Sequence, residues 1–373
     1  MFSMTNGWDG SGVLPAVELA LEQINDRTDL LAGYNLKLLW NDSQCVAGKA
    51  PRILFDHILN EPTKLIILGA ACSPNTQAVA VAAHYWNLLT VSYSSTSSAL
   101  SNRVKYPYFY RTVPLENTIH NPPKVWFMKT YGWKKVAIIY ENDEVFQKVR
   151  DSRTSAEDLM SRIAEINGTV VTEIVDNEAK NQVENLKVRI FKPQAYVRKQ
   201  RSSSKYDITF SQAYRVGLYG PGVFWTTPGW YEAQWWRIGD GKMACNVEEL
   251  TEVVERSLII GTDVAPISSL NKLTVAGITP SEFSAILKNR IATWPRYRNV
   301  THNNYMAYAF DAMWAIGLML NKTSARLEER AFSGSGKKLE NFTYNDSDLG
   351  KMFFKEMAET NFFGASVSAA VYD

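Results

Sequence analysis

Apolar residues in the first third of the chain follow two alternating patterns, one helical and one extended. After Gly12 they recur every three or four positions, at Val13, Val17, Leu21 and Ile24. This spacing predicts an amphipathic helix. Runs rich in apolar residues then predict strands over 34–40, 65–68 and 88–92, and helical spacing predicts helices over 50–59 and 76–85. Such alternation is typical of a parallel, doubly wound sheet.

A second series of the same kind follows a proline-rich connection near Pro114 and 122–123. Its pattern predicts helices over 125–131, 145–166, 280–290 and 306–320, and strands over 135–140, 169–175 and 258–260. With 373 residues, the chain exceeds the usual size of a single core. We therefore predict an α/β protein of two lobes, each with a doubly wound parallel sheet, and several chain crossings between them.

One segment interrupts this regular pattern. Residues 187–205 contain seven basic residues and no acidic one, at a point where a strand and a helix are due. We interpret the segment as a solvated or disordered loop. A functional basic patch is the alternative, which the lack of a helical stripe disfavours.

Two polar segments directly follow predicted strands. Residues 69–74 come after the strand at 65–68, and the serine-rich residues 92–98 come after the next strand. The carboxyl ends of parallel strands meet at one edge of a sheet, where ligands bind. Hydroxyls and backbone N–H groups there can hold a carboxylate, especially beside a helix N-terminus. The alternative is that both segments are simply polar turns.

Two tryptophans lie in predicted turns. Trp230 follows a Pro-Gly pair, and Trp8 lies in the glycine-rich segment 6–10. Either ring could cover a ligand or attract a cation. Ordinary packing in the core is the alternative.

Composition narrows the class of protein. The chain is 46% apolar and 21% charged, as in globular proteins, and its net charge of +2 indicates no nucleic-acid partner. No stretch is long and apolar enough to cross a membrane and no signal peptide precedes the first helix, so we expect a fragment. The four histidines lack metal-ligand spacing, and no nucleotide-binding or nucleophile motif occurs. We predict no enzyme, no metal and no cofactor.

Glycosylation motifs and cysteines indicate the compartment. Six Asn-x-Ser/Thr motifs favour secretion, at Asn41, Asn167, Asn299, Asn321, Asn341 and Asn345. Three cysteines are too few to staple the fold, and at least one lacks a partner within the chain.

Several blocks resemble the extracellular ligand-binding module of metabotropic GABA (type B) receptors. They are Gly12–Ala20, Trp86–Leu88, Tyr106–Pro114, Pro228–Glu232 and Thr360–Gly364. The resemblance runs from about residue 2 to 364, except for 188–210, which is divergent or aberrant. It implies the bilobed "Venus flytrap" fold of type I periplasmic binding proteins and class C G-protein-coupled receptors.

The resemblance also implies roles for individual residues. Trp8, Ser73 and Trp230 match agonist contacts, and Thr96 keeps a hydroxyl where the family has serine. Two positions depart from the pattern: Val113 replaces a histidine, and Tyr305 replaces the glutamate that meets the agonist's ammonium group. Cys45 and Cys72 match a family disulfide. Cys245 matches half of another, whose partner position holds Ser211.

From the resemblance we expect a receptor module on the extracellular side of the plasma membrane. Lobe one would comprise 1–115 and about 260–325, and lobe two 120–255 and about 326–373. The module would sense or transmit binding of GABA or a related amino acid by lobe closure, in a heterodimer with a second subunit. A membrane domain outside this chain would couple it to a G protein. The alternative is a soluble amino-acid-binding protein without signalling.

Overall fold

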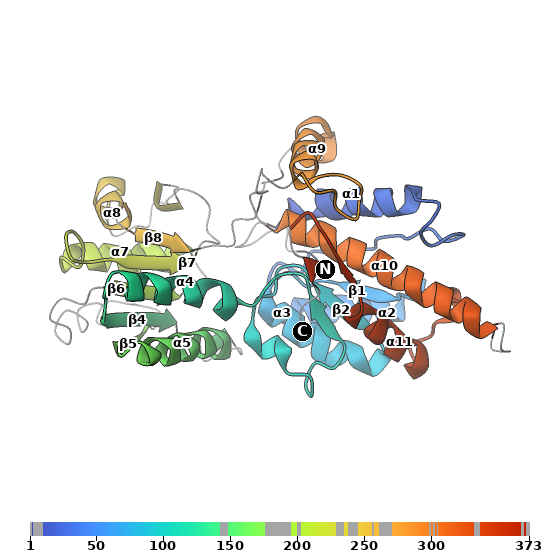
Figure 1. Cartoon of the computed structure of the whole chain (residues 1–373), viewed down its shortest axis with the longest axis horizontal. Coiled ribbons are helices and arrows are strands. Elements are labelled where there is room, and N and C mark those ends of the chain that lie inside the picture. Colours follow the sequence, from blue (N-terminus) through green and yellow to red (C-terminus); the bar gives the residue numbers. More distant parts are fainter. Residues whose placement is uncertain are drawn as a thin grey trace. The chain divides into compact units, whose positions relative to one another are not determined.

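A computed structural model describes the chain at residues 2, 10–141, 148–175, 195–199, 203–228, 235–237, 245–255, 257–260, 271–297, 300, 303, 305–331, 336–366 and 369–370. The chain divides into two units (Figure 1). Unit 1 comprises 1–114 and 264–373, and unit 2 comprises 115–263. The chain therefore passes from one unit to the other after Pro114 and again after Asp263.

Unit 1 contains a three-stranded parallel sheet with the strand order β1-β2-β3. The strands are β1 (Ile66–Leu68), β2 (Leu89–Ser92) and β3 (Phe109–Arg111). Every residue of β2 and β3 is buried, because helices and loops cover the sheet. All three strands end toward the same edge, where residues 69–74 and 93–98 continue the chain.

The long helix α10 (Met306–Ala331) forms the centre of this unit. Nearly all residues of its first four turns are buried, as expected of a helix that is apolar on all sides. It packs on α1 (Val13–Asp26), on α11 (Ser347–Ala358) and on β1 and β2. The other helices of unit 1 are α2 (Lys49–Leu59), α3 (Ser73–Ala83), α9 (Pro280–Thr293) and the 3-10 helices η1 (His84–Trp86), η2 (Ser98–Ser101), η4 (Pro295–Tyr297) and η5 (Leu339–Asn341).

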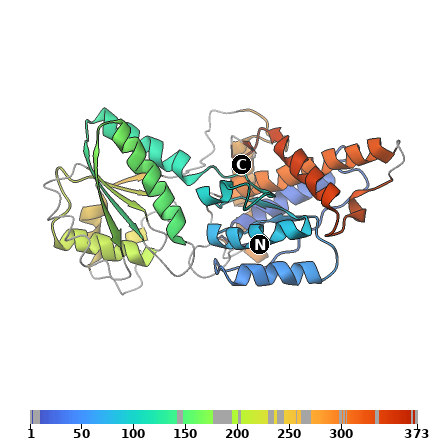
Figure 2. The ribbon, with the colours of Figure 1, turned by 90° about the horizontal axis from the view of Figure 1, so that it is seen from below.

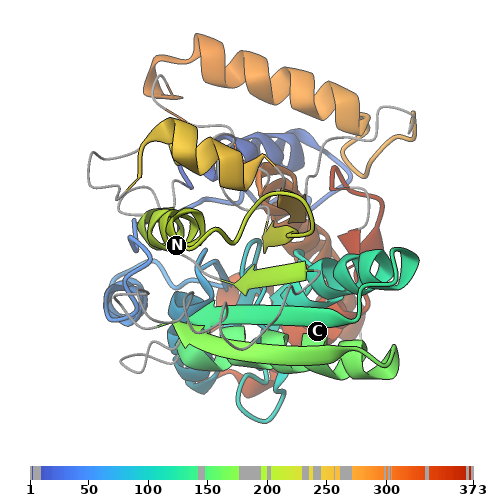
Figure 3. The same cartoon turned by 90° about the vertical axis from the view of Figure 1, so that its left-hand side faces the viewer.

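Unit 2 contains a five-stranded parallel sheet with the order β5-β4-β6-β7-β8 (Figure 3). Its strands are β4 (Lys135–Glu141), β5 (Thr169–Val175), β6 (Ala195–Lys199), β7 (Trp225–Pro228) and β8 (Ser257–Ile260). Among its described residues the helices are α4 (Glu116–Thr130), α5 (Lys148–Glu165), α7 (Ser203–Arg215), α8 (Val247–Val254) and the 3-10 helix η3 (Trp235–Arg237).

Alternate residues of β4 supply the two cores of unit 2. Val136 and Ile138 pack with α4 and α5 on one face, whereas Ala137 and Ile139 pack with α7 and α8 on the other. Figure 2 shows α5 lying along the strands on its face of the sheet. Helices on both faces of parallel sheets confirm the predicted fold class.

Three predictions about single elements need correction. The predicted strand at 34–40 forms no ladder in the described residues; beside it, a single parallel bridge joins Phe2 to Asp42. The proline-rich connection is part of helix α4, which contains Pro122 and Pro123. The basic segment is not a loop throughout, because 195–199 forms strand β6 between β4 and β7, and α7 begins at Ser203.

The C-terminal part of the chain was predicted in the wrong lobe. Residues 326–373 fall in unit 1, together with 264–325. Their apolar side chains complete the core around α10, among them Leu339, Phe342, Leu349 and Phe353. The short strands β9 (Asn361–Phe362) and β10 (Ala369–Ala370) form an antiparallel pair in the same segment.

Candidate functional site

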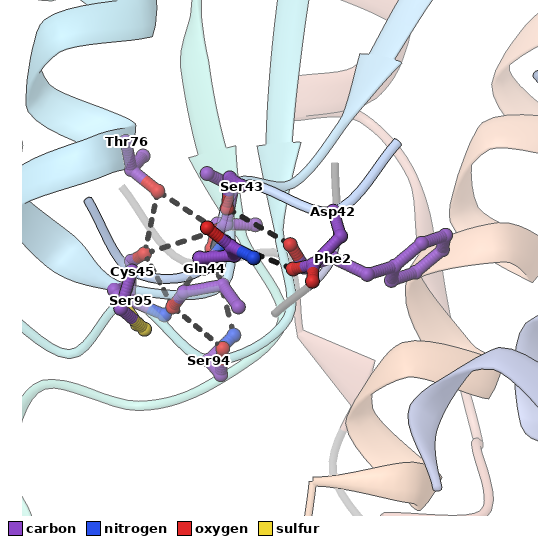
Figure 4. Close-up of a disulfide and its surroundings, with 12 residues drawn as sticks. Phe2, Asp42, Ser43, Gln44, Cys45, Thr76, Ser94 and Ser95 are labelled. Carbon is purple, nitrogen blue, oxygen red and sulfur yellow. Dashed lines mark hydrogen bonds between the residues drawn. A yellow bond between two sulfur atoms is a disulfide. The ribbon is translucent and has the colours of Figure 1, made fainter. Parts of the chain in front are cut away.

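The loops that follow β1 and β2 are joined by hydrogen bonds. The carbonyl oxygen of Ala70 accepts from Thr76 Oγ1 at 2.8 Å and from Ser92 Oγ at 2.9 Å. The Ala71 carbonyl accepts from Ser94 Oγ at 2.7 Å. Thr76 and Ser95 are joined through their hydroxyls at 2.7 Å (Figure 4). The predicted convergence of the two strand-end segments is therefore present, with side-chain hydroxyls as the links.

Ser73 and Thr96 belong to these two loops. Ser73 begins helix α3, and its Oγ accepts a hydrogen bond from the Ser97 N–H at 3.3 Å. Thr96 directly precedes Ser97, so both candidate residues lie at the same edge of the sheet. Both are buried, Ser73 at 4% and Thr96 at 9% exposure. A ligand that reached these hydroxyls would be largely shielded from water.

The N-terminus of α3 gives this edge a positive electrostatic character. Its first turn contains no acidic residue, and Cys72 at the N-cap makes no side-chain capping bond. Because the helix dipole is positive at this end, it favours a negatively charged group beside Ser73. A carboxylate fits both this field and the neighbouring hydroxyls.

A disulfide joins Cys45 to Cys72, with a Cα–Cα distance of 5.5 Å (Figure 4). This confirms the pairing that the resemblance implied. Cys72 directly precedes Ser73, so the bridge ties the start of α3 to the segment 42–45. That segment is itself held by the bridge between Asp42 and Phe2.

Cys245 lies where the resemblance placed it, beside Ser211. Its thiol is buried, forms no disulfide, and donates a hydrogen bond to the Ser211 carbonyl at 3.6 Å. The two positions that the resemblance pairs are thus adjacent in unit 2, although Ser211 carries no sulfur atom.

Arg111 is a component of this edge that the sequence reasoning missed. It ends strand β3 and is completely buried. Its guanidinium group donates to the carbonyls of Ser95 and Ser97, the residues on either side of Thr96. The available signal in the sequence was an arginine that directly follows two aromatic residues, Phe109 and Tyr110.

Tyr305 and Val113 belong to the core of the same unit. Tyr305 directly precedes α10 and is 9% exposed; its ring lies 6.4 Å from that of Tyr308. Val113 is completely buried. Neither side chain carries a negative charge. Trp8 and Trp230 lie outside the described residues, and their implied contacts stay predictions.

The glycosylation motifs differ in accessibility. In four motifs the asparagine is exposed: Asn41, Asn167, Asn341 and Asn345. Asn321 is half-buried in α10, and its Oδ1 accepts a hydrogen bond from the Leu31 N–H at 2.8 Å. Asn299 lies outside the described residues.

Neither a metal-ion site nor a membrane-spanning helix occurs in the described part of the chain. It contains no group of three or more His, Cys, Asp or Glu side chains arranged to hold a metal ion. None of its helices combines the length and the apolar character that spanning a membrane requires.

Two units with parallel sheets, linked by repeated chain crossings and carrying a polar strand-end site, define a class of bilobed ligand-binding proteins. The sequence matches the model of the family described as "Receptor family ligand binding region" over residues 12–366. The chain belongs to this family, which has the Venus flytrap fold. Membership confirms the fold and the resemblance predicted from the sequence, and it assigns the chain to ligand binding rather than catalysis.

Curated relatives include both subunit types of one receptor. The chain is 36% identical over 372 residues to the mouse (Mus musculus) gamma-aminobutyric acid type B receptor subunit 1, covering 98% of this chain and 36% of the relative. It is 32% identical over 369 residues to the human (Homo sapiens) subunit 2, covering 97% and 37%. For the Caenorhabditis elegans subunit 1 the values are 32% over 372 residues, 98% and 39%. The chain thus spans little more than a third of the length of these relatives.

Proposed function

We propose that the chain is the extracellular ligand-binding module of a GABA type B receptor subunit. The observation that carries this proposal is the convergence of Ser73 and the Thr96 loop at the N-terminus of α3, in a chain that matches the receptor family throughout. The ligand is GABA or a related small amino acid. Ligand binding promotes lobe closure only as far as the closed state binds the ligand more tightly than the open state.

The carboxylate of the ligand would lie at this edge of unit 1. Ser73 Oγ accepts from a backbone N–H, which leaves its own hydrogen to donate to a carboxylate oxygen. Thr96 offers a second hydroxyl from the neighbouring loop. Trp8 and Trp230 remain proposed contacts for the aliphatic part of the ligand.

The ammonium end of the ligand would lack a charged partner. Tyr305 and Val113 stand where the agonist-binding pattern has an acid and a histidine, and both are buried. A desolvated ammonium group without a counter-charge loses about 2–5 kcal/mol, which corresponds to roughly 1.5 to 3.5 decades in affinity. We therefore propose that this subunit binds GABA weakly, in the millimolar range.

Calorimetric titration of the secreted module with GABA tests this site. We expect weak binding that is lost in Ser73→Ala, since that substitution removes a hydroxyl donor from the carboxylate. Ser347→Ala, at the exposed start of α11, serves as the matched control and should leave binding unchanged. Micromolar binding by the wild-type chain would contradict the proposed weak affinity. Binding that is equally strong in Ser73→Ala would contradict the proposed site.

The proposed partner is a second receptor subunit, which would contact helices of unit 1. The face formed by α2 and η1 supports this proposal, because Leu59 is 81% exposed and Tyr85 is 76% exposed. Phe55, also exposed, packs edge-on against Trp86 with ring centroids 5.7 Å apart. Exposed apolar patches of this kind are typical of interaction sites. We further propose that a membrane domain of the full-length receptor couples the pair to a G protein at the plasma membrane.

Sedimentation of the module mixed with a related subunit tests the pairing. We expect a heterodimer that Leu59→Asp and Tyr85→Asp weaken, since each places a charge within the apolar face. Val104→Asp is a suitable control, because Val104 is 96% exposed and lies outside α2 and η1. A mixture that contains only monomers with every related subunit would refute the proposed partner.

A further inference from the structure

We infer that Arg111 is a positioning residue for the candidate ligand site, acting through the loop that carries Thr96; this inference rests on the proposed function. The guanidinium group is completely buried at the end of β3. One of its nitrogens, Nη1, donates to the Ser95 carbonyl at 3.1 Å and to the Ser97 carbonyl at 2.6 Å. The other, Nη2, donates to Ser101 Oγ at 2.5 Å.

These bonds fix the loop on both sides of Thr96. The two carbonyl acceptors belong to the residues immediately before and after it, so one rigid group determines the path of the main chain through Thr96. A run of small polar residues has many accessible conformations, and ordering them on binding would cost affinity. Arg111 removes this cost in advance, because the loop is already held when a ligand arrives.

The same bonds connect Arg111 to Ser73. Ser97, whose carbonyl Arg111 holds, donates its N–H to Ser73 Oγ. Ser97 Oγ also accepts from the Ala99 N–H at 3.2 Å and from Gln77 Nε2 at 3.4 Å. Displacement of the loop would therefore shift the hydrogen-bond partner of Ser73 as well. The two hydroxyls proposed to bind the carboxylate thus depend on one buried guanidinium group.

An arginine is required for this geometry. Its planar fork presents several N–H donors at fixed angles, whereas a lysine ammonium is a point charge at the end of a flexible chain. A lysine at position 111 keeps the charge but cannot reach two carbonyls and a hydroxyl at once. Arg111→Lys therefore tests the hydrogen-bonding geometry of the guanidinium group and not its charge.

The test compares Arg111→Lys with Arg290→Lys. Arg290 is also a buried arginine of unit 1, but its fork binds Glu22 on α1. Amide hydrogen exchange of the unliganded module is measured by NMR at Ser95 and Ser97, with the β2 amides of residues 89–91 as an internal reference. We expect exchange at Ser95 and Ser97 to rise about tenfold in Arg111→Lys, relative to β2, and to stay unchanged in Arg290→Lys.

The second readout is GABA affinity by calorimetry. We expect Arg111→Lys to weaken binding about tenfold, because the loop that carries Thr96 must then be ordered when the ligand binds. Exchange that is unchanged, or that rises equally in β2, would overturn the inference. So would a loosened loop with unchanged GABA affinity in Arg111→Lys.

The hydrogen-exchange measurement does not depend on GABA binding, and a second variant replaces Arg111→Lys if that variant does not fold. If the wild-type module binds neither GABA nor a related amino acid, the proposed ligand fails, and the exchange readout still decides whether Arg111 orders the loop. If Arg111→Lys does not fold, Ser101→Ala removes the Nη2 acceptor while the arginine is kept. It should raise exchange at Ser97 severalfold, and no rise there would overturn the inference.

Discussion

The carboxylate of Asp311 holds the C-terminal segment of unit 1 against helix α10. It accepts hydrogen bonds from the Ala365 N–H at 2.8 Å, from the Ser366 N–H at 2.8 Å and from Ser366 Oγ at 2.5 Å. Gly364 lies against the same carboxylate: a Cβ added there would stand 2.3 Å from an Asp311 oxygen. A single buried side chain therefore determines how residues 364–366 pack.

We expect Gly364→Ala to destabilise the protein by about 1–3 kcal/mol, because the new methyl group must displace a carboxylate held by three hydrogen bonds. Gly336→Ala is the matched control, since a Cβ at Gly336 meets no atom within 4 Å. Urea denaturation of both variants measures the difference. Equal stabilities of the two variants would show that Asp311 does not hold the segment tightly.

Burial also makes Asp311 sensitive to pH. Desolvation raises its pKa from 3.8 to about 6, although the hydrogen bonds from Ser366 and Ala365 act in the opposite direction. The folded state therefore binds more protons than the unfolded state between these values, and the contribution of Asp311 to stability falls as pH rises through them. The shift corresponds to about 3 kcal/mol.

The pH dependence of unfolding in wild type and Asp311→Asn tests this shift. Between pH 4 and about 6.5, we expect the free energy of unfolding of the wild type to fall by about 2 kcal/mol relative to the variant. The amide of the variant does not titrate, so it provides the baseline. Parallel profiles of the two proteins across this range would rule out a raised pKa for Asp311.

At the scale of elements, the disulfide is the strongest constraint on the start of α3. It joins two cysteines that are 27 positions apart in the sequence, and Cys72 is the N-cap of the helix whose first residue is Ser73. Replacing both Cys45 and Cys72 by serine should cost about 2–4 kcal/mol of stability, since the unfolded chain regains the freedom that the bridge removes.

Denaturant unfolding measures this cost, and Cys245→Ser supplies the control, because Cys245 forms no disulfide. We also expect non-reducing peptide mapping of secreted protein to find the Cys45 and Cys72 peptides joined. Two free thiols at these positions would contradict the bridge.

The pattern of alternating strands and helices was sufficient to predict the fold class, because buried parallel strands are continuous apolar runs. The pattern gave wrong predictions where the local composition of a segment does not match the place of that segment in the fold. Strand β6 has the sequence Ala-Tyr-Val-Arg-Lys and lies within a strongly basic segment, yet its place between β4 and β7 is set by the sheet. The 34–40 segment shows the reverse: it is apolar enough for a strand but forms no ladder with any residue that the structure describes.

The candidate site was only partly predictable. Ser73 and the Thr96 loop could be placed together because strand ends of a parallel sheet share an edge. Arg111 could not, because its role depends on the register of β3 beside β2, which pairs it with Ser92. The sequence shows an arginine after two aromatic residues, but the strand register that brings it close to Ser95 and Ser97 is a property of the folded sheet.

At the scale of the whole molecule, the chain has a receptor ligand-binding fold. We propose that it carries a GABA-type site which lacks one charge. In this proposal, Ser73, Thr96 and the N-terminus of α3 bind the carboxylate of the ligand, and Tyr305 stands in place of the acid at the ammonium end.

Comparing GABA binding by Tyr305→Glu and Tyr305→Gln tests this claim most directly. The two side chains have similar size, so the difference between them isolates the carboxylate. We expect Tyr305→Glu to bind GABA about two decades more tightly than the wild type, and Tyr305→Gln to show no comparable gain. Equal affinities of the Glu and Gln variants, both as weak as the wild type, would contradict the claim.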